Sequence, residues 1–528
     1  MHRFVLMTVL LISLTACNLE ASPGTPTPVY DPFVPLNEGT PAGDIFTNDT
    51  AGIPNLLVTK RAGPTPTFVP LNVDLPLARP AGAPIFTPTP NPPRALPTLR
   101  QDSDQYVVQS GDTLGVIAQK YGVSLQALMQ VNGLDDADLL SVGQTLTIPA
   151  PEPGETGTAF KIIPDSELVY GPASTLFNTR VFVQQKGGYL FDYTEDVDGE
   201  TLEGWQIIDL VSQNYSVNPR LLLALLEYQS EWVTNPNPPV VEYPLGLEDS
   251  WHSGLYMQLT WTADTLNYGY YSWVANSIPT WVLLDGSLIP VDPTINAGTA
   301  GVQHFFAYLD DYFTWFEDVT AFGFFQTYFF MFGNPFDLAI EPLLPANLGS
   351  PALQLPFEPG VTWSFTGGPH GGWDSGSAWA ALDFGPPGET AGCSPSDEWV
   401  VAAADGWIVR SADGAVMQDL DGDGYEQTGW VVFYMHIETR DRVSLKTYVY
   451  AGERIGHPSC EGGFSNGTHL HIARKYNGQW IAADGDLPFI MDGWVSSGDS
   501  YEYDGFLRKG NLSIEAWDGR NELNQISR

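Results

Sequence analysis

The chain has 528 residues, of which 43% are hydrophobic, and a formal net charge of −40. This length exceeds that of an ordinary single domain, so we expect several domains, and the hydrophobic content is sufficient for packed cores. Such an acidic excess argues against a nucleic-acid partner, which would require basic patches, and it favours solubility.

Residues 1–17 have the features of a secretory signal that ends in a lipidation site. Arg3 precedes an apolar run, Phe4–Leu14, which is shorter than the about 20 residues that span a bilayer. The sequence Leu-Thr-Ala-Cys that ends at Cys17 resembles a bacterial lipobox. The resemblance implies acylation of Cys17 and a lipid anchor in the membrane. A signal that is cleaved without lipidation is the alternative.

Residues 18–104 are rich in Pro, Thr, Ala and Gly and show no hydrophobic period. Such a segment buries too little apolar surface to offset its ordering entropy, so we predict a disordered linker. A Pro-rich chain extends by up to about 3.1 Å per residue, which gives this linker a reach on the order of 100 Å.

Residues 105–150 are predicted to form a strand, two helices and a strand. The strands are Tyr106–Val108 and Gln144–Pro149, and helical spacing of apolar residues lies between them. This βααβ pattern resembles the LysM domain, as do two short stretches, Ser-Gly-Asp-Thr-Leu and Val-Asn-Gly. The resemblance implies binding of N-acetylglucosamine-containing glycans of peptidoglycan or chitin, and a small domain that binds no sugar is the alternative. The candidate glycan-binding residues are Gly111, Asp112, Thr113 and Leu114.

Residues 160–348 are predicted to begin with a strand-rich part, up to about Glu200, and to continue as an α-helical domain. Two helices are expected within Trp205–Trp232, broken at Val-Asn-Pro, and a core helix is expected at Phe322–Phe332. The stretch Leu221–Ser230 resembles the catalytic helix of lysozyme-like lytic transglycosylases. Two later stretches, Gly254–Leu259 and Asp292–Gly298, resemble further motifs of that family.

The chain departs from this family where the catalytic glutamate is expected, because Gln229 stands there. A transglycosylase needs a carboxylic acid to protonate the leaving oxygen, and an amide cannot supply that proton. Glu227 and Glu231 are two residues away and project in other directions on a helix. We therefore expect a glycan-binding or structural domain, with an active transglycosylase as the alternative.

Residues 351–528 are predicted to form a mainly antiparallel β domain, with strands at Val400–Val409, Trp430–Met435 and His469–Ile472. In a strand, His469 and His471 project from the same face, so both can address one metal ion. The candidate site residues in chain order are His370, Asp383, His436, His469 and His471.

This order of residues resembles the lysostaphin and β-lytic family of zinc endopeptidases. The resemblance implies one catalytic Zn²⁺ held by His370, Asp383 and His471, with His436 and His469 as the catalytic pair. One of the pair would take a proton from water, and the other would stabilise the oxyanion. The implied reaction is hydrolysis of a peptide bond in the stems or cross-bridges of peptidoglycan.

Two further features of this domain each leave two interpretations. Cys393 and Cys460 are expected to form a disulfide in an extracytoplasmic compartment, and two buried thiols are the alternative. The acidic stretch with Asp419, Asp421 and Asp423 resembles the start of a Ca²⁺ loop. The twelfth position, where an EF-hand has glutamate, holds a tryptophan, so a β-hairpin turn is the alternative.

Together these features predict a surface-anchored bacterial lipoprotein that is a multidomain peptidoglycan hydrolase. It would comprise a small βααβ LysM domain, an α-helical lysozyme-like middle domain and a mainly antiparallel β metallopeptidase domain. The expected partners are peptidoglycan and, through the lipid anchor, a membrane. The alternative function is that of a non-catalytic, cell-wall-binding activator of an amidase.

Overall fold

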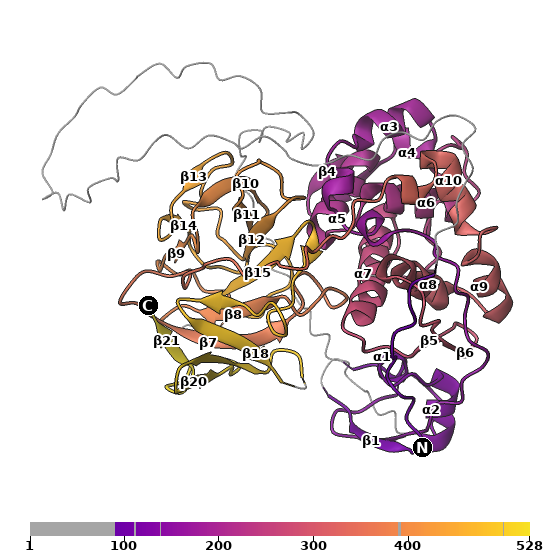
Figure 1. Cartoon of the computed structure of the whole chain (residues 1–528), viewed down its shortest axis with the longest axis horizontal. Helices are drawn as coiled ribbons and strands as arrows, with labels where there is room; N and C mark the ends of the chain where they lie inside the picture. The colour runs from indigo at the N-terminus through magenta and orange to yellow at the C-terminus, as the bar shows by residue number, and fades with distance from the viewer. Residues whose placement is uncertain (1–89, 110–111, 138, 389–391, 500) are drawn as a thin grey trace, which may run out of the picture. The chain divides into compact units, whose positions relative to one another are not determined.

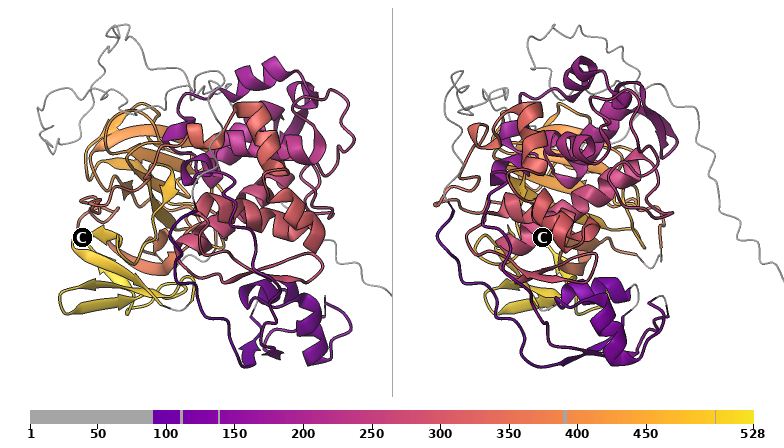
Figure 2. Two further views of the ribbon diagram at one scale, coloured as in Figure 1. Left: turned by 45° about the vertical axis from the view of Figure 1, so that its right-hand side comes forward. Right: turned by 90° about the vertical axis from the view of Figure 1, so that its right-hand side faces the viewer.

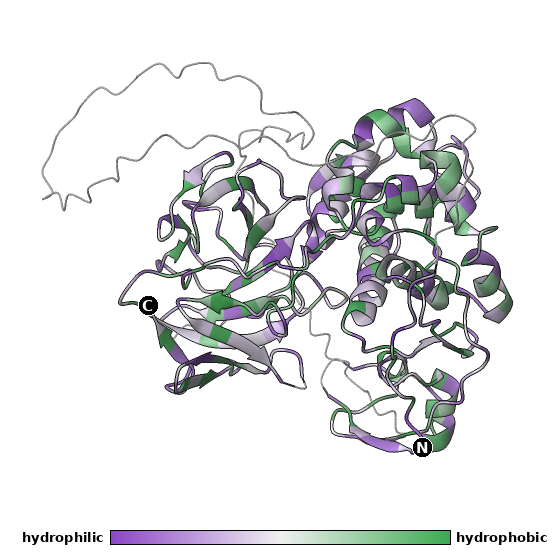
Figure 3. Cartoon of the chain, viewed as in Figure 1, coloured by the Kyte–Doolittle hydropathy of each residue, from purple (hydrophilic) through white to green (hydrophobic). Residues whose placement is uncertain are grey.

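The computed structural model describes residues 90–528, with the exception of 110–111, 138, 389–391 and 500. The predicted signal with Cys17, most of the predicted linker and Gly111 lie outside the described residues. Figure 1 shows the elements of the described part in chain order. Hydrophilic and hydrophobic residues mix along the ribbons (Figure 3), and no described helix is long and apolar enough to cross a membrane.

The first folded unit has the predicted order of strand, helix, helix and strand. Its elements are β1 (Asp104–Val107), α1 (Leu114–Lys120), α2 (Leu125–Asn132) and β2 (Thr145–Ile148). The two strands pair antiparallel, with Asp104 opposite Ile148. Ser124 caps α2 by accepting from the amide of Ala127, and Gly133 ends the helix in a left-handed conformation. The βααβ prediction is confirmed.

Helices dominate the middle region. Its α-helices are α3 (Thr179–Lys186), α4 (Tyr189–Asp192), α5 (Gly204–Tyr215), α6 (Pro219–Ser230), α7 (Leu255–Val274), α8 (Ala297–Leu309), α9 (Tyr312–Asp318) and α10 (Phe324–Phe332). Its shorter elements are the 3₁₀ helices η1 (Asp165–Glu167), η2 (Pro172–Ser174) and η3 (Pro335–Asp337), and the strands β3 (Thr194–Val197), β4 (Glu200–Glu203), β5 (Thr280–Val282) and β6 (Leu288–Pro290).

The break between α5 and α6 follows from three residues that lie close together in the sequence. Ser216 ends α5 in a left-handed conformation. Asn218 caps α6 by accepting from the amide of Arg220, and Pro219 occupies the first helical position. The predicted pair of helices is present, and the predicted core helix at Phe322–Phe332 is α10, which buries Phe324 and Tyr328 among other side chains.

The prediction of a strand-rich start up to about Glu200 is wrong. Its regular elements are mostly helical, namely η1, η2, α3 and α4, and β3 is the one described strand before that residue. Alternating β-branched and aromatic residues in α3 favour a strand locally. The helix forms nevertheless, because Asn178 caps it by accepting from the amide of Val181, Gly187 ends it and Val183 packs into the core.

The C-terminal region is an antiparallel β domain, as predicted, and its described residues contain no helix. The main sheet has nine strands in the order β13-β10-β11-β12-β15-β8-β7-β21, with β16 paired to β15. These strands are β7 (Thr362–His370), β8 (Ala381–Gly385), β10 (Gly406–Ala412), β11 (Ala415–Asp419), β12 (Trp430–Met435), β13 (Tyr448–Val449), β15 (Leu470–Tyr476), β16 (Gln479–Trp480) and β21 (Gln525–Ser527).

Two smaller sheets complete this domain. One pairs β9 (Val400–Val401) with β14 (Arg454–Gly456), and the other orders β17 (Ile490–Met491), β18 (Trp494–Gly498), β19 (Gly505–Lys509) and β20 (Leu512–Glu515). In Figure 2 the yellow strands of the second sheet lie beside the main sheet, whose strands range from orange to yellow. The single strand predicted at Val400–Val409 is two strands, β9 and β10, because the chain turns between them and they join different sheets.

The helical region and the main sheet share one hydrophobic core. Its members include leucines of α6 and aromatic residues of α7 and α8, together with Phe433 of β12 and Trp480 of β16. Polar contacts lie beside this core: the Ser216 hydroxyl donates to the carbonyl of Gly478 at 2.7 Å, and the Trp480 amide donates to the Tyr271 hydroxyl at 2.9 Å. The sheet is therefore packed against the helices by side chains from both regions.

Candidate metal centre

Three adjacent strands of the main sheet carry the predicted metal ligands. His370 is the last residue of β7, Asp383 lies in the middle of β8, and His471 is the second residue of β15. Asp383 and His471 are direct partners across the sheet. Gly367 of β7 lies opposite Asp383, and a side chain there would come within 2.8 Å of its carboxylate. A glycine at this position therefore leaves room for the carboxylate over β7.

The three side chains converge on one point. Asp383 Oδ1 lies 3.2 Å from His370 Nε2 and 3.3 Å from His471 Nδ1, and the two nitrogens lie 3.0 Å apart. Ligands at about 2.1 Å from a tetrahedral ion are separated by about 3.4 Å, which is close to this spacing. Asp383 Oδ1 is buried and accepts no hydrogen bond of regular geometry from a described residue. The donor set and the unsatisfied oxygen fit a zinc ion.

Backbone carbonyls orient both histidine ligands. His370 Nδ1 lies 2.8 Å from the carbonyl of Gly368, and His471 Nε2 lies 3.1 Å from the carbonyl of Gly372. A ring nitrogen that donates to a carbonyl carries the proton, so the other nitrogen presents its lone pair. In both residues that other nitrogen is the one that faces Asp383.

His436 and His469 lie beside this triad, with ring centroids 4.5 Å apart. His469 Nε2 is 3.6 Å from Asp383 Oδ1, and its Nδ1 is 2.7 Å from the carbonyl of Gly467. His436 Nδ1 is 3.0 Å from the carbonyl of Glu461. His436 has a positive φ of 63°, an unfavourable conformation for a residue with a side chain. The two imidazoles are thus held next to the ligands but outside their triangle.

Burial and mutual charge set the protonation of the site. Burial opposes ionisation of Asp383, but the charges of His370 and His469 outweigh it and hold the Asp383 pKa well below its usual range. Burial, followed by the charges of His469 and His471, lowers the pKa of His436 to about 3. Burial also lowers the pKa of His471. Burial opposes the charged form of His370 as well, but Asp383 outweighs burial and raises the His370 pKa. The ionised carboxylate of Asp383 suits the binding of a cation.

A cavity of about 550 Å³ opens beside Asp383 and His469. Tyr503 and Arg520 also line it, and the Tyr503 ring stacks on His370 with centroids 4.2 Å apart. Sequence reasoning missed both residues, since they lie more than a hundred positions from His370 and no motif includes them. Near this cavity, a disulfide joins Cys393 to Cys460 across 67 residues of sequence.

The other candidates of this domain lie apart from the triad. The carboxylates of Asp419, Asp421 and Asp423 gather within 4.8 Å of one another. Asp419 accepts from the amides of Gly422 and Gly424, at 3.0 and 2.8 Å, and this pattern is typical of a turn. The Ca²⁺ site therefore stays a prediction, and the contacts of Asp419 are accounted for by the turn alone.

In the middle domain, Glu227 and Glu231 flank Gln229 at the end of α6. Glu227 accepts from the amides of Val233 and Thr234, both at 3.0 Å, and thus fastens the end of α6. Glu231 is the left-handed residue that ends α6, and it accepts from Asn235. Both glutamates therefore make local contacts at the end of α6, and the absence of a catalytic acid beside Gln229 stays a prediction.

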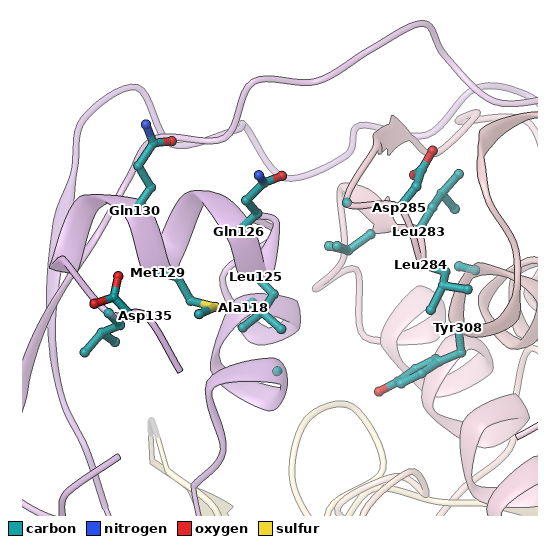
Figure 4. Close-up of a pocket in the computed structure, with 15 residues that line it drawn as sticks. Ala118, Leu125, Gln126, Met129, Gln130, Asp135, Leu283, Leu284, Asp285 and Tyr308 are labelled. Atoms are coloured by element: carbon teal, nitrogen blue, oxygen red, sulfur yellow. The ribbon is translucent and has the colours of Figure 1, made fainter. Parts of the chain in front are cut away.

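In the first unit, Asp112 accepts from the Tyr106 hydroxyl at 2.8 Å and Leu114 is buried. A cavity of about 740 Å³ is lined by α2 residues such as Gln126 and Met129 and, from the middle region, by Tyr308 (Figure 4). Asp112, Thr113 and Leu114 do not line it.

Two family models match the chain. Residues 106–149 match the LysM domain, so the first folded unit is a LysM domain. Residues 161–346 match the LasA N-terminal domain, which covers the helical region. The lysozyme-like assignment of that region stays a prediction.

The chain is also similar to known proteins. It is 26% identical to protease LasA of Pseudomonas aeruginosa over 343 residues, which cover 61% of this chain and 75% of that protein. It is 31% identical to the N-acetylmuramoyl-L-alanine amidase XlyA of Bacillus subtilis over 122 residues, or 22% of this chain and 40% of the amidase. A solved deep-sea M23 metalloprotease, pseudoalterin, aligns over 34% of this chain and all of its own, with 24% identity and a TM-score of 0.27.

Proposed function

We propose that the chain is a zinc-dependent endopeptidase that cleaves peptide stems or cross-bridges of peptidoglycan and is held on the cell surface by a lipid on Cys17. The observation that carries this proposal is the convergence of His370 Nε2 and His471 Nδ1 on Asp383 Oδ1, a buried oxygen that lacks a regular hydrogen bond. The similarity to protease LasA and the LysM domain support the substrate class.

The ion would be held by His370, Asp383 and His471, which leave a fourth position open. Zinc, when bound there, lowers the pKa of water and polarises a carbonyl group. His436 and His469 lie within reach of the same place, and each presents Nε2 because its Nδ1 faces a backbone carbonyl. In the proposal, one of them takes the proton of the attacking water and returns it to the leaving amine. The other would carry a proton on both ring nitrogens, because only an imidazolium can keep Nδ1–H on its carbonyl and also donate from Nε2 to the developing oxyanion.

The cavity beside Asp383 would receive the substrate chain, and the LysM domain would hold the enzyme against the glycan strands of the same polymer. Binding through a second module raises the local concentration of cleavable peptide. The lipid anchor would keep both modules near the membrane, and the Pro-rich linker would give them reach.

The decisive experiment measures zinc per chain and release of peptides from purified cell walls, for the parent protein and for His370→Ala. We expect about one zinc per parent chain, lysis by the parent, and loss of both in the variant. Mass spectrometry of the released muropeptides identifies the bond. A parent protein that binds no zinc and releases no peptide from cell walls would contradict the proposal. It would favour the non-catalytic amidase activator. Labelling with a radioactive fatty acid, with Cys17→Ser as control, tests the anchor.

A further inference from the structure

The loop between β7 and β8, residues 371–380, carries one of the two carbonyls that orient the histidine ligands. The Gly372 carbonyl is the one that faces His471 Nε2, at 3.1 Å. The Gly372 amide donates to the carbonyl of Ala378 at 3.0 Å and closes the base of the loop. Because of this closure, a displacement of the loop tip is transmitted to the Gly372 carbonyl.

Side chains of the helical region hold the tip of this β7–β8 loop. Asp264, in the middle of α7, accepts from the Gly376 amide at 2.6 Å and from the Ser375 hydroxyl at 3.0 Å. The Tyr215 hydroxyl, at the end of α5, donates to Asp374 at 2.9 Å. The loop is thus fastened to two helices that lie far from it in the sequence.

Backbone packing makes this contact close. A Cβ atom on Gly376 would lie 2.0 Å from the backbone oxygen of Asp264, so the loop rests directly on α7. A Cβ atom on Gly372 would lie 2.7 Å from the ring of Trp480, which is part of the shared core. The glycines allow the loop to fit between α7 and the sheet.

The carboxylate of Asp264 is held in a place that disfavours its charge. Burial and the neighbouring Asp374 raise its pKa to about 7. The remaining acidic neighbour, Glu502, accepts from the amide of Gly371 at 3.1 Å and holds the other end of the loop. The hydrogen bonds of Asp264 to the loop account for a carboxylate at this costly position.

We propose that Asp264 is a positioning residue for the metal centre: by holding the β7–β8 loop against α7, it keeps the Gly372 carbonyl on His471 and so aims His471 Nδ1 at the ion. The inference rests on the proposed zinc site. Through Asp264, the helical region, which matches the LasA N-terminal domain, contributes to the affinity of the site for zinc. Loss of a group that orients a ligand typically lowers metal affinity by about 10-fold to 100-fold.

The test is the zinc affinity of the full chain, measured by competition with a chromophoric chelator. Asp264→Ala removes both acceptors of the loop, and we expect zinc affinity to fall by about 10-fold to 100-fold. Asp264→Asn keeps an oxygen for the Gly376 amide and offers its NH₂ group to the Ser375 hydroxyl, so its affinity should stay near that of the parent. Gly376→Ala adds a Cβ atom that pushes the loop away from α7, and it should lower zinc affinity to a similar extent.

Asn214→Ala is the matched control. Asn214 of α5 accepts from Arg410 of β10 at 2.8 Å, so this variant weakens another contact between the helices and the sheet without touching the loop. Circular dichroism verifies that each variant is folded. Equal affinity in Asp264→Ala, Gly376→Ala and the parent would overturn the inference, and so would an equal loss in Asn214→Ala. A parent that binds no zinc would instead overturn the proposed function.

Discussion

At the scale of single residues, the His-x-His stretch places two chemically different imidazoles side by side. His471 turns Nδ1 toward Asp383 and directs Nε2 at a backbone carbonyl. His469 does the reverse, with Nε2 toward Asp383 and Nδ1 at a carbonyl, and its ring lies against His436. A two-residue spacing in a strand puts both rings on one face, but the local carbonyls decide which nitrogen each ring presents.

This difference predicts opposite phenotypes for the two alanine variants. His471→Ala removes a ligand, so zinc per chain should fall toward zero. His469→Ala should keep zinc near the parent level and lose about 100-fold to 10,000-fold in hydrolysis rate, the usual contribution of a proton-transfer group. Elemental analysis and cell-wall hydrolysis measure the two quantities. Loss of zinc in His469→Ala would show that the assignment of roles is reversed or shared.

A second residue-scale prediction concerns His304, which is buried in α8 with Nδ1 2.8 Å from the carbonyl of Thr265. Burial lowers its pKa from 6.5 to about 4. Between these values the unfolded chain binds a proton that the folded chain does not, so stability falls as pH falls through this window and levels off below it. The full effect is about 3 kcal/mol. Urea unfolding of the parent and of His304→Phe at pH 7 and pH 4.5 measures it, and the variant should lose less stability than the parent over this range.

The five histidine and aspartate positions of the site could be predicted from the sequence because their residue types are rare and their order resembles a known family. The residues that support them could not. Tyr503, Glu502 and Asp264 reach the site through contacts between segments far apart in the chain, and each is an ordinary residue type in an ordinary local sequence. Only the tertiary fold brings such residues together.

At the scale of elements, the positions where helices begin and end could be predicted more readily than whether a segment is a helix or a strand. Asn218 and Pro219 marked the start of α6 because each has a fixed stereochemical role there. By contrast, the part up to about Glu200 was expected to be strand-rich, and it contains the helix α3, whose residue types favour a strand. Its helical state depends on the burial of Val183 and on the turn residues at both ends, and burial is decided by the rest of the fold.

The disulfide gives a prediction at this scale. Cys393 and Cys460 close a loop of 67 residues that contains β9 to β14. In the chain-entropy model, a loop of this length stabilises the folded state by about 4 kcal/mol. The double variant Cys393→Ser, Cys460→Ser should therefore unfold at a clearly lower denaturant concentration, followed by tryptophan fluorescence. The parent under reducing conditions should match it, and no difference between oxidised parent and variant would disprove the loop effect.

At the scale of the whole molecule, the order of modules predicts how substrate form changes the rate. Removal of residues 105–150 should lower the rate on intact cell walls by a factor on the order of 100, because the tether to glycan is lost. The rate on a short soluble peptide should be unchanged, since the catalytic cavity is intact. The ratio of the rate on cell walls to the rate on the soluble peptide, measured for the parent and the truncated protein, gives the contribution of glycan binding. An equal drop on both substrates would mean that the LysM domain supports the fold instead.

The hydrophobic core that includes Phe433, Trp480 and the leucines of α6 crosses the boundary between the two regions that the sequence separates near residue 350. The boundary that the sequence suggests near residue 350 is therefore not expected to separate two independently folding units. Calorimetry should show the helices and the sheet melting in one endotherm, and a fragment that starts at residue 351 should expose an apolar sheet face and aggregate. Removal of either region should therefore destabilise the other.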